Sequence, residues 1–422
     1  MLCTAMDGRQ TGVNRKKHIP GRRLSVVIMV FYFLAFVLLA SRNQDTTGYL
    51  LSIAVPCIIF LCTHLLPLLF PADRLLMSLS GFLCALGVLL LYDTNPGYAK
   101  QQALAYGVGL IAMVFCIYLV RMIRSWRHIV RFLIPFSLLL LALPLLMGKE
   151  INGAKNWIVL GGFSFQPSEL VKLSLLLVLS CYLSRQRFIP WFLFALACLI
   201  LLMLQKDLGT ALLYYAVTLL LYWSATGNVL MSLLGLAGGG GAAWFGYRMF
   251  AHVRRRVSIW LNPWSDFERS GYQLIQGLMA IASGGLWGVG LGLGTPTSIP
   301  VYESDFIFAV LCEQFGLIFG VCVLLIYVAI IWRGMSIAVA ARFSFHGLLA
   351  MGATILIGFQ TFVIVGGVLK LIPLTGVTLP FISYGGTSLV SSMCLTGFIQ
   401  GVASLNEEDL KEDAKLGLFE HD

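Results

Sequence analysis

The chain has 422 residues, of which 59% are hydrophobic and only 11% are charged, whereas a soluble globular domain carries about 25% charged residues. This composition excludes a soluble globular protein. The mean hydropathy of +0.87 and the long uncharged runs indicate a polytopic membrane protein, because a helix needs roughly 20 apolar residues to cross a bilayer. We therefore predict an all-α fold embedded in a membrane.

The formal net charge is +10 at pH 7. A basic tail at residues 1–23 and an acidic tail at 405–422 offset each other, so the excess lies in the loops between apolar segments. Basic loops indicate membrane orientation and contact with anionic lipid rather than nucleic acid. Every cysteine except Cys3 lies in or beside an apolar run, where it is expected to pack as a small hydrophobic residue. Their spacing predicts neither a disulfide framework nor a zinc site.

The apolar segments predict about twelve transmembrane helices. In chain order they are 24–40, 49–70, 75–92, 102–119, 129–147, 169–184, 190–204, 208–224, 230–250, 305–332, 347–371 and 384–404. The first segment follows the basic tail and is too long for the core of a typical signal peptide, so we expect a retained anchor.

The distribution of Lys and Arg predicts which side of the membrane each loop faces. If the basic N-terminus is cytoplasmic, alternate short loops should also be basic. They contain Arg74, Arg121, Arg124, Arg127, Arg185, Arg187, Arg333 and Arg342. The opposite connections are rich in Gly, Pro and Trp, and they lie at 148–168, 205–207, 251–304 and 372–383. We therefore expect both termini in the cytoplasm and the functional residues at the outer face of the membrane.

The connection at 251–304 also contains Arg254, Arg255, Arg256 and Arg269, which a strict charge rule would place inside. Long loops cross the membrane largely regardless of charge, so the orientation stands. ATP and nucleotide sugars are not expected on the outer side. An enzyme acting there needs a substrate that arrives already activated, for which a lipid carrier is the natural form.

The outer end of the sixth segment carries two ionisable residues. Glu169 and Lys172 in the run FSFQPSELVKL are three residues apart and share one helix face. Two interpretations stay open, an ion pair that joins helices or a pair that lines a wet cavity and orients substrate. Asp207 in QKDLGTAL stands at the N-terminus of the eighth segment, where the helix dipole alone favours an acid, and the alternative is a role in a polar pocket or a cation site.

The long outer connection combines arginines, tryptophans and glycines. Trp260 and Trp264, close to the three consecutive arginines, suit a segment that lies in the membrane interface. The arginines bind either a diphosphate or phospholipid headgroups. The glycine-rich run at 283–294 has no βαβ unit around it, so it predicts a close backbone approach or a hinge rather than dinucleotide binding.

The tenth segment begins with a carboxylate that has a candidate chemical role. Asp305 stands at its outer end, where partial desolvation would raise the pKa and suit a general base. Stabilisation by the helix dipole is the alternative. Further along, the Pro and Gly residues at 371–388 predict a break in the helix, which membranes tolerate only where the backbone is buried in protein or lines a cavity.

Taken together and in this order, these motifs resemble the SEDS family of bacterial cell-wall synthesis, which includes FtsW, RodA and SpoVE. The resemblance extends over roughly residues 75–405 and rests on GAKNWI, FSFQPSELVKL, QKDLGTAL, NPW with GYQ, SGG with GLG, SDFIFAVL and LPFISYGGTS. It implies a peptidoglycan glycosyltransferase that polymerises lipid II and works with a class B penicillin-binding protein. It also implies a core of ten spans at 73–404, preceded by two additional helices at 24–72.

The resemblance also implies roles for individual residues. The family's essential aspartate falls on Asp305, which we expect to act as general base in an inverting transfer. The expected substrate-binding residues are Glu169, Lys172, Asp207, Lys155, Arg254, Arg255, Arg256, Gln273 and Ser383. The resemblance assigns no definite cofactor, and the charge of the leaving diphosphate would be met either by the three arginines or by a divalent cation, Mg²⁺ or Mn²⁺.

The chain departs from the family pattern at several positions around this expected site. The family commonly has Pro at Lys206, His-Thr where Glu303 and Ser304 precede Asp305, Asn at Ile364, and often Thr-Gly at 369–370. Two other functions therefore stay open. One is a transporter that flips lipid II along a path lined by the ionisable residues, and the other is a weakly catalytic scaffold that recruits a transpeptidase.

Overall fold

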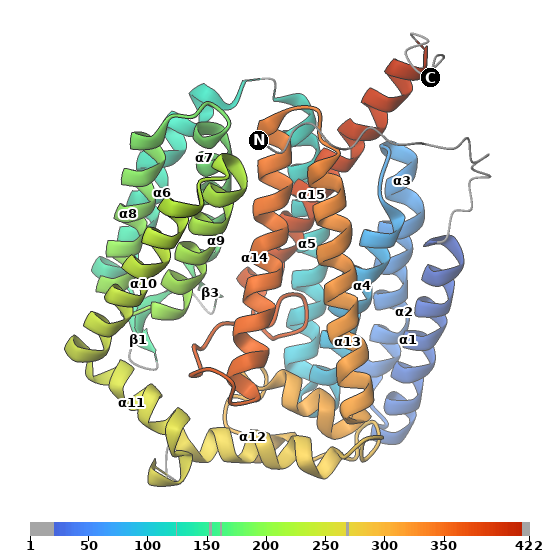
Figure 1. Ribbon diagram of the computed structural model, residues 1–422. Coiled ribbons are helices and arrows are strands. Elements are labelled where there is room, and N and C mark those ends of the chain that lie inside the picture. The colour runs from blue at the N-terminus through green and yellow to red at the C-terminus, as the bar shows by residue number, and fades with distance from the viewer. Residues whose placement is uncertain (1–20, 124, 152–153, 161–162, 267–269, 416–422) are drawn as a thin grey trace.

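The structure is a computed structural model that describes residues 21–123, 125–151, 154–160, 163–266 and 270–415. Each of the twelve predicted segments corresponds to helix in this part of the chain (Figure 1). The helices are α1 (Gly21–Asn43), α2 (Thr46–Phe60) continued by η1 (Leu61–Leu65) and α3 (Leu66–Leu69), α4 (Arg74–Thr94), α5 (Pro96–Met122), α6 (Trp126–Met147), α7 (Pro167–Leu183), α8 (Phe188–Leu204), α9 (Leu208–Thr226), α10 (Val229–Met249), α13 (Ile307–Val339), α14 (Ser344–Val368) and α15 (Gly386–Lys415).

Ten of the helical segments in the described residues are long and apolar enough to cross a membrane. The other two predicted spans, α7 and α8, have 17 residues each, which is at the short end of what a bilayer requires. The prediction of a polytopic helical membrane protein is confirmed, and the count of twelve is approximate because of these two short helices.

The all-α prediction missed a small antiparallel sheet between α6 and α7. Its strands are β1 (Lys149–Ile151), β2 (Ala154–Leu160) and β3 (Phe163–Phe165), in the order β1-β2-β3. In the register of the second pair, Ile158 lies opposite Phe165 and Val159 opposite Ser164. The strands are three to seven residues long, and such short runs have no periodicity that separates them from a loop.

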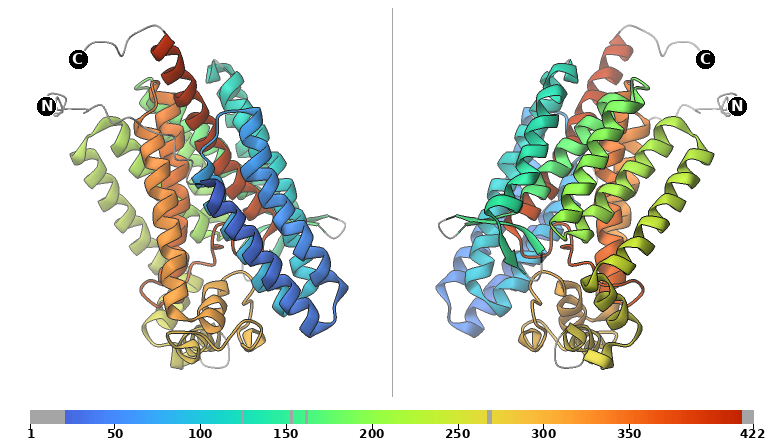
Figure 2. Two further views of the ribbon diagram at one scale, coloured as in Figure 1. Left: turned by 90° about the vertical axis from the view of Figure 1, so that its right-hand side faces the viewer. Right: turned by 90° about the vertical axis from the view of Figure 1, so that its left-hand side faces the viewer.

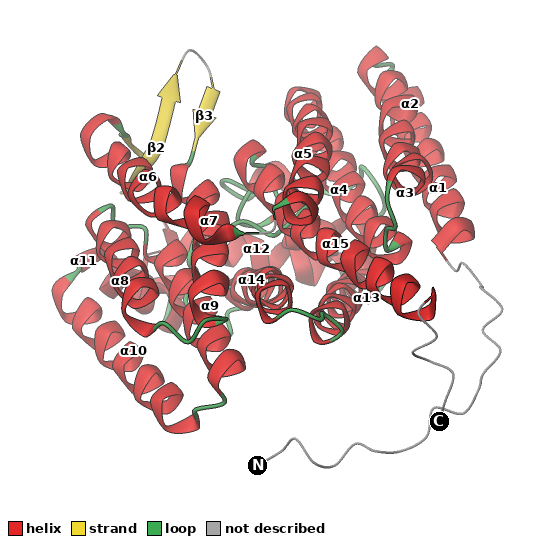
Figure 3. Cartoon of the chain, turned by 90° about the horizontal axis from the view of Figure 1, so that it is seen from above, coloured by secondary structure: helices red, strands yellow, loops and turns green. Residues whose placement is uncertain are grey.

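The bundle has a buried centre and exposed margins. Figure 3 shows α14 near the middle, with α1 and α2 at one edge and α10 at the opposite edge. In α4 and α15, 83% of the apolar window is buried, against 6% in α10. The helices α1 and α2 pack against α4 and α5, so the two additional helices cover one side of the core.

Two further helices lie across one end of the bundle instead of along it. These are α11 (Ala251–Leu261) and α12 (Ser270–Gly284), joined through the short helix η2 (Pro263–Asp266), and Figures 1 and 2 show them together at the end opposite the tip of α15. The non-helical segment between α14 and α15 folds back toward the same end (Figure 1). This end therefore gathers the irregular parts of the chain that sequence analysis assigned to the outer side.

The glycine-rich run makes the close backbone approach predicted from sequence. Helix α13 is kinked at Gly316, where φ is 84° and ψ is 167°. The run pairs with this kink through Val289 N to Glu313 O at 2.9 Å and Leu317 N to Gly285 O at 2.9 Å. A Cβ added to Gly288 would lie 2.3 Å from the carbonyl oxygen of Gln314, so side chains are excluded there.

Candidate active site

Asp305 lies on a short turn immediately before α13. The Oγ of Ser304 donates a hydrogen bond to its Oδ1 at 3.0 Å, and its side chain is half-buried. The capping position of α13 is Phe306, and no side chain caps the first turn. The carboxylate is therefore not used to cap the helix. This favours a role as general base over a role in stabilising the N-terminus of α13.

The surroundings of Asp305 alter its protonation. Burial raises the pKa of this carboxyl to about 6, and the charge of Glu303 acts in the same direction. The hydrogen bond from Ser304 and the charge of Arg256 oppose the increase. At neutral pH the group is mostly ionised and has a pKa close to the working pH, as a general base requires.

Arg256 of α11 lies beside Asp305, and Gly376 of the α14–α15 connection lies between them. The Nη1 of Arg256 donates to Thr375 O at 2.7 Å and to Leu374 O at 3.2 Å. A Cβ added to Gly376 would lie 3.7 Å from Arg256 Nη2 and 3.8 Å from Asp305 Oδ2. A carboxylate and a guanidinium thus flank one glycine whose missing side chain leaves space next to both.

The three consecutive arginines do not share this position. All three are exposed on α11, but Arg254 Nη1 donates to Arg248 O at 3.2 Å, away from Asp305. Of the three, Arg256 is the one whose charge acts on Asp305. Arg269, the fourth arginine of this connection, lies outside the described residues, as does Arg124.

Two of the predicted substrate-binding residues hold the backbone near Asp305. Ser383 Oγ donates to Ser304 O at 2.6 Å and accepts a hydrogen bond from Leu379 N at 2.8 Å. Gln273 Nε2 donates to Pro300 O at 2.8 Å, five residues before the carboxylate. Both side chains use these polar atoms to shape the turn that carries Asp305.

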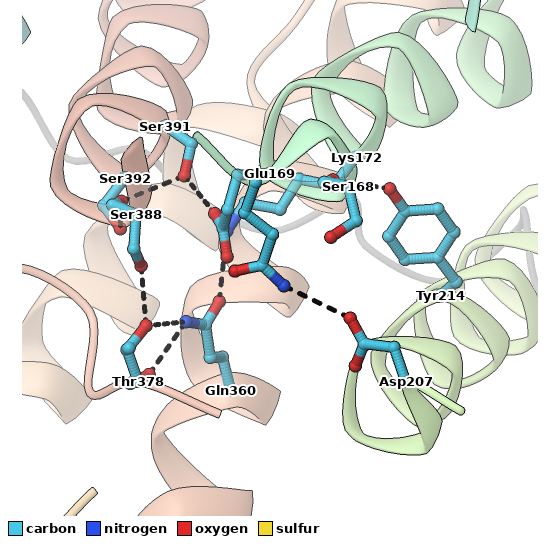
Figure 4. Close-up of polar contacts among 11 residues, drawn as sticks. Ser168, Glu169, Lys172, Asp207, Tyr214, Gln360, Thr378, Ser388, Ser391 and Ser392 are labelled. Carbon is cyan, nitrogen blue, oxygen red and sulfur yellow. Dashed lines mark hydrogen bonds and ion pairs between the residues drawn. The ribbon is translucent and has the colours of Figure 1, made fainter. Parts of the chain in front are cut away.

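Glu169 and Lys172 form the centre of a buried network (Figure 4). Glu169 Oε2 lies 2.5 Å from Lys172 Nζ and accepts a hydrogen bond from Ser391 Oγ of α15, also at 2.5 Å. Lys172 Nζ lies 3.4 Å from Gln360 Oε1 of α14, whose Nε2 donates to Thr378 O at 2.8 Å. The pair joins three helices and the α14–α15 connection, as the ion-pair interpretation expected.

Asp207 and Lys155 occupy positions that their local structure explains. Asp207 caps α9 by accepting from Thr210 N at 3.1 Å, and its Oδ2 accepts from Asn156 Nδ2 of β2 at 2.8 Å. Lys155 Nζ donates to Leu145 O in the last turn of α6 at 2.8 Å. Figure 4 shows Asp207 on a separate helix, on the side of Glu169 and Lys172 that is opposite Ser391.

Sequence analysis missed the residues that complete this network. Gln360 and Ser391 are polar side chains buried in apolar spans, at 1% and 0% exposure. A polar residue inside a span is expensive and marks a specific partner, so that signal was available in the sequence. The sequence did not reveal the partners of these two residues, because the partners come from helices far apart in the chain.

The sequence profile of the FtsW, RodA and SpoVE family, described as cell cycle protein, matches residues 74–408. The chain belongs to this family. Stage V sporulation protein E of Bacillus subtilis is 33% identical over 359 residues, which are 78% of this chain and 96% of that protein. Peptidoglycan glycosyltransferase RodA of Mycobacterium tuberculosis is 32% identical and covers 91% of both chains. That alignment is longer than the 74–408 region, so this FtsW/RodA/SpoVE member and the mycobacterial protein also resemble each other outside the family core.

Solved structures support the same assignment of this FtsW/RodA/SpoVE protein. One is described as the structural coordination of polymerization and crosslinking by a peptidoglycan synthase complex. It superimposes with a TM-score of 0.66 at 31% identity, and covers 80% of this chain and 98% of the other. RodA of Thermus thermophilus superimposes with a TM-score of 0.59 at 29% identity, and covers 79% of this chain and 97% of that one.

Proposed function

We propose that the protein is a peptidoglycan glycosyltransferase that polymerises lipid II at the outer face of the bacterial cytoplasmic membrane. The observation that carries the proposal is the half-buried Asp305 carboxylate, held by Ser304 and lying beside Arg256 at the irregular end of the bundle. The relatives named peptidoglycan glycosyltransferase, at 32% identity over most of their length, support the same reaction.

In the proposed reaction Asp305 removes the proton from the acceptor sugar hydroxyl. The hydroxyl oxygen forms a bond to the anomeric carbon of the donor strand, and the bond from that carbon to the diphosphate breaks. The undecaprenyl diphosphate leaves with the electron pair, and Arg256 is placed to meet its charge. Attack from the side opposite the leaving group inverts the anomeric centre. The proton stays on Asp305 until water removes it.

The donor groups around Asp305 favour Arg256 over a divalent cation for this neutralisation. Among the described residues, no three His, Cys, Asp or Glu side chains are grouped so that they could hold a metal ion. The cationic group next to the carboxylate is a guanidinium, which binds phosphate oxygens in pairs. The proposed reaction therefore uses Arg256 and not Mg²⁺ or Mn²⁺ at this position.

The sidedness of the chain is part of the proposal. The tip of α15 carries acidic residues that pair with arginines of neighbouring loops, Arg121 with Glu408 at 2.5 Å and Arg342 with Asp413 at 3.5 Å. The short loops at this end are rich in arginine, and arginine-rich short loops are typical of the cytoplasmic side, where acidic residues have little influence on orientation. This pattern supports a cytoplasmic location for the tip of α15. The end with α11, α12 and Asp305 then lies outside, where lipid-linked substrate is available.

A class B penicillin-binding protein is the proposed partner. The solved structure described as a peptidoglycan synthase complex that coordinates polymerization and crosslinking supports this assignment. A glycan strand released at the outer face needs crosslinking, and a transpeptidase bound to the polymerase would receive it directly.

The proposal is tested by incubating purified protein with labelled lipid II and its transpeptidase and measuring glycan length. We expect Asp305→Asn to reduce polymerisation by roughly 100- to 10,000-fold, the usual contribution of a general base. Glu407→Gln is the matched control, because this carboxylate is exposed at the opposite end and pairs with Lys411. Its rate should equal that of the wild type.

Three results would contradict the proposed function. Equal glycan yields from wild type and Asp305→Asn would remove the catalytic role of the carboxylate. Movement of labelled lipid II across vesicles without glycan growth would favour a transporter. A wild type that binds the transpeptidase but makes no glycan would favour a scaffold.

A further inference from the structure

Gln102 is a completely buried polar residue near the start of α5 that the proposed reaction does not use. Both ends of its amide are engaged by the connection between α14 and α15. Its Nε2 donates to Ser383 O at 2.9 Å, and its Oε1 accepts from Gly385 N at 3.3 Å. The side chain therefore clamps the backbone on both sides of Tyr384.

The clamped turn holds the two residues that precede Asp305. Tyr384 N donates to Glu303 O at 2.8 Å, and Ser383 Oγ donates to Ser304 O at 2.6 Å. Ser304 then donates its hydroxyl to the Asp305 carboxylate. A continuous series of hydrogen bonds thus runs from helix α5 to the candidate general base.

The turn depends on side chains for its shape. Residues 379–385 are not helical, Phe381 has a φ of 70°, and Leu379, Phe381 and Ile382 are at most 1% exposed. Buried backbone groups without a regular helix need partners from elsewhere. An amide supplies a donor group and an acceptor at once, whereas an ionised Glu lacks the donor and Met offers only a weak sulfur acceptor.

We infer that Gln102 is a positioning residue that fixes the turn at 383–385 and through it the orientation of Asp305 toward the acceptor sugar. The inference rests on the proposed function, which it extends to a residue on another helix. General-base catalysis requires the carboxylate within hydrogen-bonding distance of the proton it removes, so a displaced turn reduces turnover more than it reduces substrate binding.

The chain contains a matched control for this clamp. Gln400 of α15 is also completely buried, and its amide also engages one backbone donor and one acceptor. Its Nε2 donates to Asp73 O at 2.9 Å, and its Oε1 accepts from Asp73 N at 2.9 Å. Asp73 starts α4 at the end opposite Asp305 and pairs with Arg333.

The experiment compares Gln102→Met with Gln400→Met in purified full-length protein, using lipid II and the cognate transpeptidase. We expect Gln102→Met to lower kcat on the order of 10- to 100-fold with a much smaller change in KM. Gln400→Met should retain the wild-type kcat, although both variants lose thermal stability. Equal effects of the two substitutions on kcat would overturn the inference, and so would an effect of Gln102→Met on KM or stability alone.

Ser383→Ala serves if Gln102→Met does not fold. It removes the hydroxyl that donates to Ser304 O and accepts from Leu379 N, so it should also lower kcat, and an unchanged kcat overturns the inference. The wild type and Asp305→Asn separate the two proposals. If the wild type polymerises and Asp305→Asn does not, while Gln102→Met behaves as Gln400→Met, the positioning role alone is wrong. If the wild type makes no glycan, both proposals are wrong.

Discussion

The chemistry of Asp305 depends on opposing effects within one turn and one neighbouring helix. Burial and Glu303 raise the pKa of its carboxyl, while Ser304 and Arg256 favour the ionised form. Neither set of effects alone would give a base suited to neutral pH. An exposed aspartate is too acidic, and a fully buried aspartate without stabilising partners would stay protonated. The residues that balance the two come from different parts of the chain.

The pH dependence of polymerisation should report this balance. With a pKa of about 6 for Asp305, the base is protonated in more acidic solution, so kcat/KM should fall by about tenfold per pH unit below that value. Activity is retained as the pH rises through 6. The measurement is kcat/KM for lipid II between about pH 5 and about pH 8.

Ser304→Ala provides the internal comparison for that profile. The hydroxyl stabilises the ionised carboxylate, so its removal should raise the pKa and move the acidic limb to higher pH. The charges that face Asp305, from Arg256 on α11 and Glu303 on the same turn, stay in place. Two results would contradict the assignment of Asp305 as the base. One is an acidic limb of the wild-type pH profile at the ordinary pKa of aspartate, and the other is a shift of that limb to lower pH in Ser304→Ala.

The Glu169–Lys172 pair shows how a buried ion pair acts within such a bundle. Its net contribution to stability is small, because desolvation of both charges offsets their attraction. Its hydrogen bonds to Ser391 and Gln360 specify how α7, α14 and α15 meet. The pair therefore defines the packing next to the α14–α15 connection, which leads to the candidate active site.

At the scale of elements, the glycine-rich run acts as a fixed support for α13. Arg42 at the end of α1 donates to Gly292 O at 2.8 Å, and Gln314 of α13 donates to Asp93 of α4 at 2.6 Å. Three helices and the run thus meet at the same end as Asp305. The additional helix α1 takes part in this junction through Arg42, a structural role that its sequence did not reveal.

Replacing glycine by alanine should destabilise the protein in the glycine-rich run but not in α10. Gly288→Ala places a Cβ 2.3 Å from Gln314 O at a φ of 82°, so we expect a loss of about 1–3 kcal/mol. In Gly238→Ala the new Cβ meets nothing within 4 Å, and the substitution should be neutral or slightly stabilising because Ala favours helix. Thermal unfolding of both variants in detergent measures the difference, and similar melting temperatures would contradict the close approach.

For the whole molecule, the proposed orientation places α11 and α12 outside the cell and the tip of α15 inside. A cysteine at Ser265, exposed on η2 between α11 and α12, should react with a membrane-impermeant maleimide in intact cells. A cysteine at Glu407 should react only after the membrane is permeabilised. The wild-type chain measures background from its own cysteines, two of which, Cys57 and Cys322, are exposed in the structure.

The reverse labelling pattern would place Asp305 in the cytoplasm, where polymerisation of a glycan strand for the cell wall has no outlet. Labelling of both positions in intact cells would mean that the impermeant reagent had entered. The two engineered cysteines therefore test the orientation from both sides of the membrane.

Apolar runs and charge in the sequence were enough to predict the twelve helical segments, a helix break that the structure places between α14 and α15, and the ionisable residues worth testing. These features are local, because a run of apolar residues must cross the bilayer and a Pro-Gly cluster must interrupt a helix wherever it lies. The sheet formed by β1, β2 and β3 was missed, since these strands are held by hydrogen bonds to one another and not by a pattern within each strand.

The sequence by itself determined that the protein is a polytopic helical membrane protein, and its motifs identified the family. The tertiary structure decided which polar residues meet. It brought Arg256, but not Arg254 or Arg255, to Asp305, and it joined Gln102 of α5 to a turn about 280 residues later. The physical reason is that hydrophobicity acts along each segment, whereas a hydrogen bond requires two atoms about 3 Å apart, and only the packing of the helices sets that distance.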